Sequence, residues 1–432
     1  MWEFIAGTLI ASWLNLLPRD QPKLSPLKPL AWEQTNIFQL PQLDQDLLAE
    51  QIIVAYLNDL NTQGAQSSRQ GIWVQSDWSI LGSNQGQTPL PAASLTKVAT
   101  TLAALNKWGT QHQFLTDVYL LGKVEQGVLQ GDLLVRGAGD PLFVWEEAIA
   151  LGNALNQLGI REVQGNLLVT DQFYMNFQAQ SVAAGKLLQQ ALDYRQWDES
   201  IKRQYDQLPP ETKLPQVTFT GQVQAAKQIP PQKQLLIRHH SLVLTEILRQ
   251  MNLYSNNHMA QILSDLLGGA GEIAAAAQQV AGVAPAEIEL VNGSGLGEAN
   301  RISPRAVCQM LMALDRLLRP SQSSVADLLP TAARDTKGTV RDRSLPPGTA
   351  IKTGTLDRVS ALAGAIPTSD RGTVYFSIIN YGGQIEQFRQ QQDLLLNQLI
   401  QPWKLSSSGA SLVSENSWYL GDPQRNTLKQ IN

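Results

Sequence analysis

Residues 91–105, the stretch that decides the fold, read Pro91-Ala92-Ala93-Ser94-Leu95-Thr96-Lys97-Val98-Ala99-Thr100-Thr101-Leu102-Ala103-Ala104-Leu105. Their length and their alanine and leucine content predict a helix that begins at Pro91 and continues to a break at Gly109. Residues three apart on a helix share one face, so Ser94 and Lys97 are expected to lie within reach of each other. In this geometry a hydroxyl and an amine can share a proton.

A lysine amine acts as a base only when it is neutral. Lowering its pKa from about 10.4 to near 7 costs about 4.6 kcal/mol, and burial or a second cation nearby shifts the pKa in that direction. The Ser-x-x-Lys spacing alone is weak support, because Ser25-Pro26-Leu27-Lys28 repeats it in a proline-rich stretch where no helix would align the pair. The chemistry needs support from the rest of the chain.

Size and composition narrow the class of protein. A chain of 432 residues is long enough for two or more domains. Its net charge of -4 at pH 7, without basic clusters, argues against nucleic acid as a partner. The single cysteine, Cys308, excludes an internal disulfide and a thiolate cluster for a metal, and we expect it in the core.

The first 18 residues are apolar but shorter than the ~20 needed to cross a bilayer. Their length fits a secretory signal, although Glu3 stands where lysine or arginine is usual, and Arg19 and Lys23 follow the apolar run instead of preceding it. We expect export, with residues 1–18 as a signal or an anchor segment. Weak membrane association stays open.

Strand patterns occur at both ends of the chain. Short strands are predicted at 71–75 and 78–82, and three more at 349–356, 360–367 and 372–381. Together they predict an α+β fold with a five-stranded antiparallel sheet. Flanking helices are predicted at 43–58, 241–251, 256–267, 271–281, 303–318 and 387–400.

The middle of the chain has a different character, with strands predicted at 117–121, 132–136 and 165–170 and a helix at 144–158. No element can be placed reliably in 171–235. We predict a catalytic domain from 19–108 plus 236–403, an inserted α/β module at 109–235 and a polar C-terminal tail at 404–432.

Two further motifs bear on the chemistry. Ser255-Asn256-Asn257 lies at a loop-to-helix junction, although serine and asparagine are common N-caps and Ser414-Glu415-Asn416 repeats the pattern. Lys352-Thr353-Gly354-Thr355 lies on a strand, where Gly354 is expected to leave the backbone open to a ligand. The order S-x-x-K, S-x-N, K-T-G is typical of penicillin-recognising serine enzymes. The glycines at 293–297 do not complete a dinucleotide motif, because Glu298 stands where a glycine is needed, and they predict a turn.

The chain also resembles the D-alanyl-D-alanine carboxypeptidase/endopeptidase family of the penicillin-binding protein 4 type. The resemblance covers most of the chain and is carried by three segments, at 131–141, at 292–296 with 300–304, and at 352–356 with 361–364. The chain departs from the family in two ways. Gly297 stands where serine is usual, and the segment between the first two motifs, residues 109–250, is shorter than is usual in the family. The resemblance implies a β-lactamase/transpeptidase-like fold in which the inserted α/β module is reduced.

The resemblance implies a role for each motif residue. Ser94 would attack the D-Ala-D-Ala carbonyl while Lys97 takes its proton, and Lys352 together with burial would keep Lys97 deprotonated. Ser255 would pass a proton to the leaving amine, and Asn257 would hold Lys97 and the substrate amide. The substrate-binding residues would be Lys352, Thr353, Gly354 and Thr355, and the backbone N–H groups of Ser94 and Thr355 would form the oxyanion hole.

No metal or cofactor is implied, and the four histidines are interpreted as structural or exposed. The implied substrates are peptidoglycan stem peptides ending in D-Ala-D-Ala, with β-lactam antibiotics as covalent inhibitors, in the periplasm or cell envelope. Two alternatives stay open: a β-lactamase, although no E-x-x-L-N loop follows Asn257, and a catalytically silent wall-binding protein. The balance of carboxypeptidase and endopeptidase action, the third stem-peptide residue and the oligomeric state also stay open.

Overall fold

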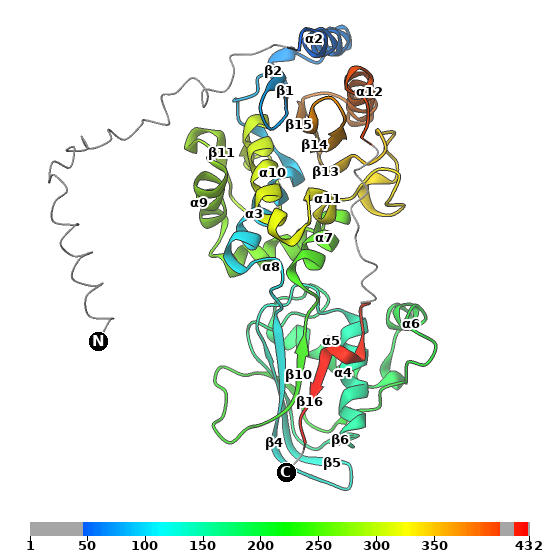
Figure 1. Cartoon of the computed structure of the whole chain (residues 1–432). Coiled ribbons are helices and arrows are strands. Elements are labelled where there is room, and N and C mark those ends of the chain that lie inside the picture. The colour runs from blue at the N-terminus through cyan, green and yellow to red at the C-terminus, as the bar shows by residue number, and fades with distance from the viewer. Residues whose placement is uncertain (1–45, 407–418, 431–432) are drawn as a thin grey trace, which may run out of the picture. The chain divides into compact units, whose positions relative to one another are not determined.

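The computed structural model describes residues 46–406 and 419–430. The predicted signal or anchor segment at 1–18 lies outside these residues. So do the second Ser-x-x-Lys motif at 25–28 and the second Ser-x-Asn motif at 414–416. The described residues form two sheets of five and eight strands, a small three-stranded one, and helices around and between them (Figure 1).

The five-stranded sheet combines both ends of the described chain, as the sequence predicts. Its strand order is β13-β14-β15-β1-β2, and every neighbouring pair is antiparallel. Strand β13 therefore lies at an edge of this sheet. The strands are β1 (Gln70–Gln75), β2 (Ile80–Asn84), β13 (Ala350–Leu356), β14 (Val359–Thr368) and β15 (Gly372–Tyr381).

Helices cover both faces of this sheet. Successive residues of a strand point to opposite faces, and in these strands both sets are apolar, so each face needs a covering layer. In β1, Ile72 and Val74 join the core under α2 (Leu47–Thr62) and α12 (Ile385–Trp403). Trp73, between them, joins the larger core on the opposite face. That core is built with α3 (Thr96–Trp108), α7 (Leu244–Leu253), α8 (Asn257–Leu267), α9 (Ala270–Ala281), α10 (Pro304–Leu318) and the short α11 (Val325–Leu328).

The predicted start of the central helix at Pro91 is wrong. Residues Leu90–Pro91 form strand β3, which pairs with β12 (Arg301–Ile302), itself paired with β11 (Ile288–Glu289). A 3-10 turn follows at Ala93–Leu95, and α3 begins only at Thr96. The reason is the backbone of Ala93, whose φ of 47° does not fit a right-handed helix.

The second sheet has its own core and its own helices. Its long antiparallel strands are β4 (Leu115–Glu125), β5 (Val128–Gly137) and β10 (Gln234–His240), and shorter strands add parallel pairs beside β5. The strands of the parallel pairs are β6 (Glu162–Val163), β7 (Leu167–Val169), β8 (Thr218–Phe219) and β9 (Val223–Ala225). A further short strand, β16 (Asn426–Leu428), pairs antiparallel with β10. The helices of this part are α4 (Trp145–Gln157), α5 (Ser181–Ala191) and α6 (Glu199–Tyr205).

This sheet draws on residues that the sequence analysis placed elsewhere. The sequence predicts residues 236–240 in the catalytic domain and 426–428 in a polar tail, whereas β10 pairs with β4 and β16 pairs with β10. Strand β16 forms by backbone pairing along β10, which leaves little trace in a three-residue sequence pattern. The division into domains at 109 and 235 stays a prediction.

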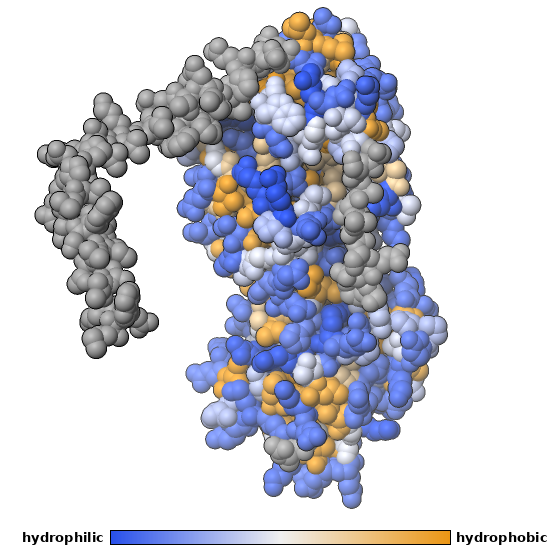
Figure 2. Space-filling view, viewed as in Figure 1, coloured by the Kyte–Doolittle hydropathy of each residue, from blue (hydrophilic) through white to orange (hydrophobic). Residues whose placement is uncertain are grey.

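Three further observations concern the hydropathy of the surface, the length of the helices and the single cysteine. On the face in Figure 2, hydrophilic side chains predominate and hydrophobic residues form separate patches, which is usual for folded proteins. Within 46–406 and 419–430, no helix has the length and apolar character to span a bilayer. Cys308 is buried, as the sequence predicts.

Candidate active site

Ser94 lies on the tight turn that precedes α3. The Ala93 backbone is left-handed, and such a conformation in a non-glycine residue costs about 1–3 kcal/mol and persists only where neighbouring contacts hold it. One such contact is the Ala92 N–H, which donates to the Asn300 carbonyl at 2.9 Å. The turn places the half-buried Ser94 just before the helix N-terminus, where the helix dipole favours negative charge.

Lys97 lies one turn further along, and its side chain is fully buried. Its Nζ is 2.9 Å from Ser94 Oγ, 2.7 Å from Asn257 Oδ1 and 2.6 Å from the Ser294 carbonyl oxygen. Two of these partners can only accept a hydrogen bond, whereas the serine hydroxyl can also donate one. A neutral amine fits this set: its two hydrogens go to the two carbonyl oxygens, and its lone pair accepts the Ser94 proton.

The electrostatics of the two lysines explain how such a neutral amine arises. Burial lowers the pKa of Lys97 from 10.5 to about 7. Burial, together with the charge on Lys97, lowers the pKa of Lys352 well below its usual range. Burial accounts for the Lys97 shift, and the repulsion between the two amines disfavours a proton on both of them; the predicted role of Lys352 in keeping Lys97 deprotonated stays a prediction. Because each protonated amine repels the other, the two buried lysines do not both hold a proton at neutral pH.

The Ser-x-Asn motif lies at the junction of α7 and α8, beside the two lysines. Ser255 has a φ of 51°, and Asn257 is the first residue of α8, whose N-cap is Asn256. Lys352 Nζ donates to Ser255 Oγ at 2.9 Å and to the Thr353 carbonyl at 2.7 Å. The structure therefore brings all three motifs together. Lys97 contacts Ser94 of its own motif and Asn257 of the second, and Lys352 contacts Ser255 of the second motif.

The K-T-G-T residues lie on the edge strand β13. Lys352 and Gly354 are buried, Thr353 is half-buried and Thr355 is exposed. A Cβ at position 354 would lie 2.9 Å from the Ser94 backbone nitrogen and 3.0 Å from the Ala93 Cβ. Gly354 therefore lets the strand approach the nucleophile turn. That its backbone is also open to a ligand stays a prediction.

One contact in the site was missed from the sequence, that of the Ser294 carbonyl with Lys97. The loop that carries it is ordered by Asn292, whose Oδ1 accepts the backbone N–H groups of Ser294 at 3.1 Å and Gly295 at 2.8 Å. Gly295 has a φ of 80°, and a Cβ there would lie 1.8 Å from the Ala93 carbonyl oxygen. The predicted turn therefore packs directly against the Ser94 turn.

Replacing Gly295 with alanine is expected to destabilise the fold by about 2 kcal/mol or more, because the methyl group overlaps the Ala93 carbonyl and the backbone is left-handed. The measurement is the free energy of unfolding from denaturant titration. Gly297→Ala is the matched control, since its φ is 96° but nothing lies within 4 Å of the added Cβ. Equal losses in the two variants would contradict the packing argument.

The described part of the chain contains no group of three or more histidine, cysteine, aspartate or glutamate side chains placed to hold a metal ion. The site itself is built from hydroxyl, amine and amide groups. A hydroxyl beside a buried amine, with the edge strand β13 next to the nucleophile turn, defines the class of serine-type peptidases with a penicillin-recognising fold.

The chain belongs to the D-Ala-D-Ala carboxypeptidase 3 (S13) family, whose model matches residues 53–185 and 207–399. The predicted resemblance is thus confirmed. Among curated proteins, the chain is 34% identical to the D-alanyl-D-alanine carboxypeptidase DacB of Haemophilus influenzae over 90 residues, which make up 21% of this chain. The aligned part spans 19% of that relative and 22% of a second carboxypeptidase, from an Actinomadura species.

Solved structures extend the likeness over most of the fold. Penicillin-binding protein 4 of Haemophilus influenzae matches with a TM-score of 0.61 and 20% identity, over 79% of this chain and 99% of that one. A predatory endopeptidase from Bdellovibrio bacteriovorus, acylated by penicillin G and in complex with an immunity protein, matches with a TM-score of 0.64 and 22% identity. That match covers 76% of this chain and 92% of the endopeptidase chain. The predicted fold class is confirmed.

Proposed function

We propose that the protein is a serine-type D-Ala-D-Ala carboxypeptidase, with endopeptidase action on cross-linked peptides, that works through an acyl-enzyme on Ser94. The observation that carries the proposal is the buried Lys97 amine, 2.9 Å from Ser94 Oγ and hydrogen-bonded to two carbonyl oxygens. A hydroxyl is a weak nucleophile unless a base takes its proton as it attacks. This amine is the nearest base to it.

In the acylation step, Ser94 Oγ forms a bond to the carbonyl carbon of the penultimate D-Ala while its proton moves to Lys97 Nζ. The backbone N–H groups of Ser94 and Thr355 stabilise the oxyanion. The C–N bond then breaks, and the leaving amine takes the hydroxyl proton of Ser255, whose oxygen contacts Lys352. The proton that Lys97 took from Ser94 replaces it, so that Lys97 is again a neutral base for the water of the next step. Water hydrolyses the ester and restores Ser94.

Substrate binding would use the edge strand β13 at its half-buried Thr353 and exposed Thr355. An extended peptide can pair with an edge strand through its backbone. The hydroxyls of Thr353 and Thr355, with the Lys352 amine, would hold the terminal carboxylate, while Asn257 would hold both Lys97 and the substrate amide. Gly354 contributes by letting the strand lie against Ser94.

The substrates follow from this chemistry and from the relatives. We assign stem peptides ending in D-Ala-D-Ala as substrates and β-lactams as covalent inhibitors, and we place the protein in the cell envelope after export. Penicillin G acylation of the Bdellovibrio relative supports the inhibitor class. A wall-directed peptidase needs access to peptidoglycan, which supports the location.

The test is mass analysis of a purified muropeptide mixture after incubation with the protein. Loss of the terminal D-Ala is expected from stem pentapeptides, and conversion of cross-linked dimers to monomers would report endopeptidase action. Absence of any product, with no labelling by a fluorescent penicillin, would overturn the proposal in favour of a silent wall-binding protein. Faster turnover of a chromogenic cephalosporin than of a D-Ala-D-Ala peptide would favour a β-lactamase.

A further inference from the structure

One cation outside the three motifs reaches the end of the K-T-G-T strand. Arg389 of α12 donates from Nη2 to Thr355 Oγ1 at 3.0 Å, and from Nη1 to Glu386 Oε1 at 2.6 Å. Its side chain is 36% exposed, so the guanidinium is open to a ligand. Thr355 is itself exposed. Sequence reasoning did not single out Arg389, because it lies more than thirty residues after the motif.

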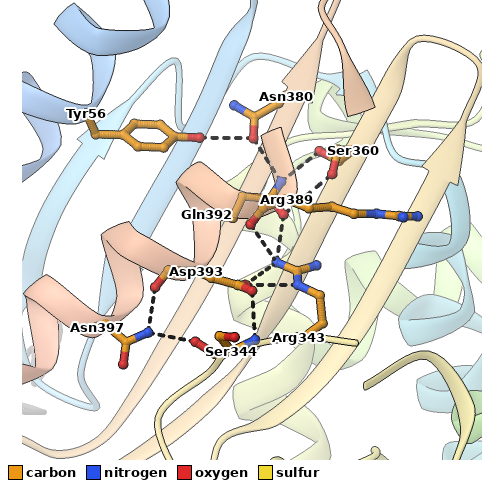
Figure 3. A network of polar contacts seen from close by, with 9 residues as sticks. All are labelled: Tyr56, Arg343, Ser344, Ser360, Asn380, Arg389, Gln392, Asp393 and Asn397. Carbon is orange, nitrogen blue, oxygen red and sulfur yellow. Dashed lines mark hydrogen bonds and ion pairs between the residues drawn. The ribbon is translucent and has the colours of Figure 1, made fainter. Parts of the chain in front are cut away.

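A polar network fixes the position of α12 over the sheet (Figure 3). Gln392 is fully buried; its Nε2 donates to the Ser360 carbonyl at 3.1 Å and to Asn380 Oδ1 at 2.8 Å. Ser360 is the register partner of Thr355 in the neighbouring strand. The helix is therefore held to the strand beside β13.

Arg343 reinforces this attachment from the loop before β13. Its Nη2 donates to Gln392 Oε1 at 3.0 Å and to Asp393 Oδ1 at 2.6 Å (Figure 3). The Arg343–Asp393 pair is largely buried, and removing one partner of such a pair is costly. Arg389 lies one helical turn before Gln392 and Asp393. Its backbone is thus fixed, although its side chain reaches the surface.

The hydrogen bond to Thr355 orients that hydroxyl. Because Oγ1 accepts a hydrogen bond from Arg389, the threonine O–H is left to donate to another acceptor. A carboxylate beside Thr355 would accept this hydrogen bond and would lie next to the guanidinium charge. Hydrogen bonds between charged partners are about twice as strong as neutral ones.

We propose that Arg389 is a specificity-determining residue that favours substrates with a free carboxylate on the leaving residue. The inference rests on the proposed function and deepens it: Arg389 orients Thr355 as a donor and adds a positive charge that an amide-terminated peptide cannot use. Glu386 competes with the substrate for the same guanidinium. Since 76% of its side chain is exposed, its ion pair with Arg389 holds the cation only weakly.

This arrangement predicts opposite changes in kcat/KM when Arg389 and Glu386 are replaced. Arg389→Gln is expected to lower kcat/KM for a blocked peptide ending in D-Ala-D-Ala by about tenfold, mainly through KM, and to change kcat/KM for its C-terminal amide less than twofold. Glu386→Gln is expected to raise kcat/KM for the free acid about twofold, because it removes the competing carboxylate. Arg389→Lys should restore part of the loss, since it keeps the charge without the planar fork.

The experiment measures kcat and KM for both peptides with all four proteins, at low and high salt. An exposed charge is screened, so the advantage of the wild type over Arg389→Gln on the free acid should shrink with salt. Equal losses on acid and amide, or a loss in Glu386→Gln matching that in Arg389→Gln, would overturn the inference and leave Arg389 a structural residue. If the wild type cleaves neither peptide and takes up no penicillin, the proposed function fails, and the inference fails with it.

Discussion

Replacing Ser94 with alanine is expected to abolish covalent labelling by a fluorescent penicillin and to lower peptidase activity by about 10,000-fold or more. In the proposed mechanism the Ser94 hydroxyl, 2.9 Å from the Lys97 amine, forms the acyl bond. Removing it leaves the oxyanion donors and the substrate-binding strand in place. The measurements are gel fluorescence after penicillin treatment and the intact mass of the treated protein.

Ser25→Ala is the matched control, because Ser25 and Lys28 have the same spacing as Ser94 and Lys97. This variant is expected to label like the wild type. Equal labelling of the wild type and Ser94→Ala would remove Ser94 from the mechanism, and loss of labelling in Ser25→Ala would move the nucleophile to the N-terminal motif.

The second large effect is expected from Lys97→Met, which should slow acylation by about 1,000-fold to 10,000-fold. Methionine has a similar length but cannot take the Ser94 proton, and it leaves the Asn257 and Ser294 oxygens without their donor. The quantity to measure is the second-order rate constant for penicillin acylation. Thermal unfolding of the same samples reports whether the variant is folded.

Lys97→Arg separates the base from its charge. A guanidinium stays protonated, so it can keep a hydrogen bond in the site but cannot act as a base. It is expected to be as slow as Lys97→Met. Acylation of Lys97→Arg at the wild-type rate would show that the position supplies a charge and not a base. Lys28→Met, in the second motif, should acylate normally.

The central sheet could be predicted because its strands combine short apolar runs with turn residues between them. Its order could not, since pairing β15 with β1 depends on contacts across about 300 residues of chain. The start of the central helix was wrong for a similar reason. Pro91 is a favourable first residue, but Leu90–Pro91 pairs with β12, and the Ala93 backbone turns left-handed before α3 begins.

In the active site, too, some features could be predicted from the local sequence and others depend on tertiary contacts. Side-chain motifs such as Ser94 with Lys97 can be recognised, because the chemistry requires those residue types at that spacing. The Ser294 contact uses a backbone carbonyl, which any residue could supply. Arg389 reaches Thr355 only because the buried Gln392 holds α12 to the sheet. Such contacts depend on tertiary packing and leave no local pattern.

The neutral state of the Lys97 amine is the claim on which the mechanism depends. NMR titration of protein labelled with 13C at the lysine Cε measures it directly, with the Lys97 signal assigned by its loss in Lys97→Met. Because the unprotonated amine is the base, acylation should become faster as pH rises through the same value. The account predicts an apparent pKa of about 7 for Lys97. A Lys97 signal that stays protonated up to pH 10 would contradict it.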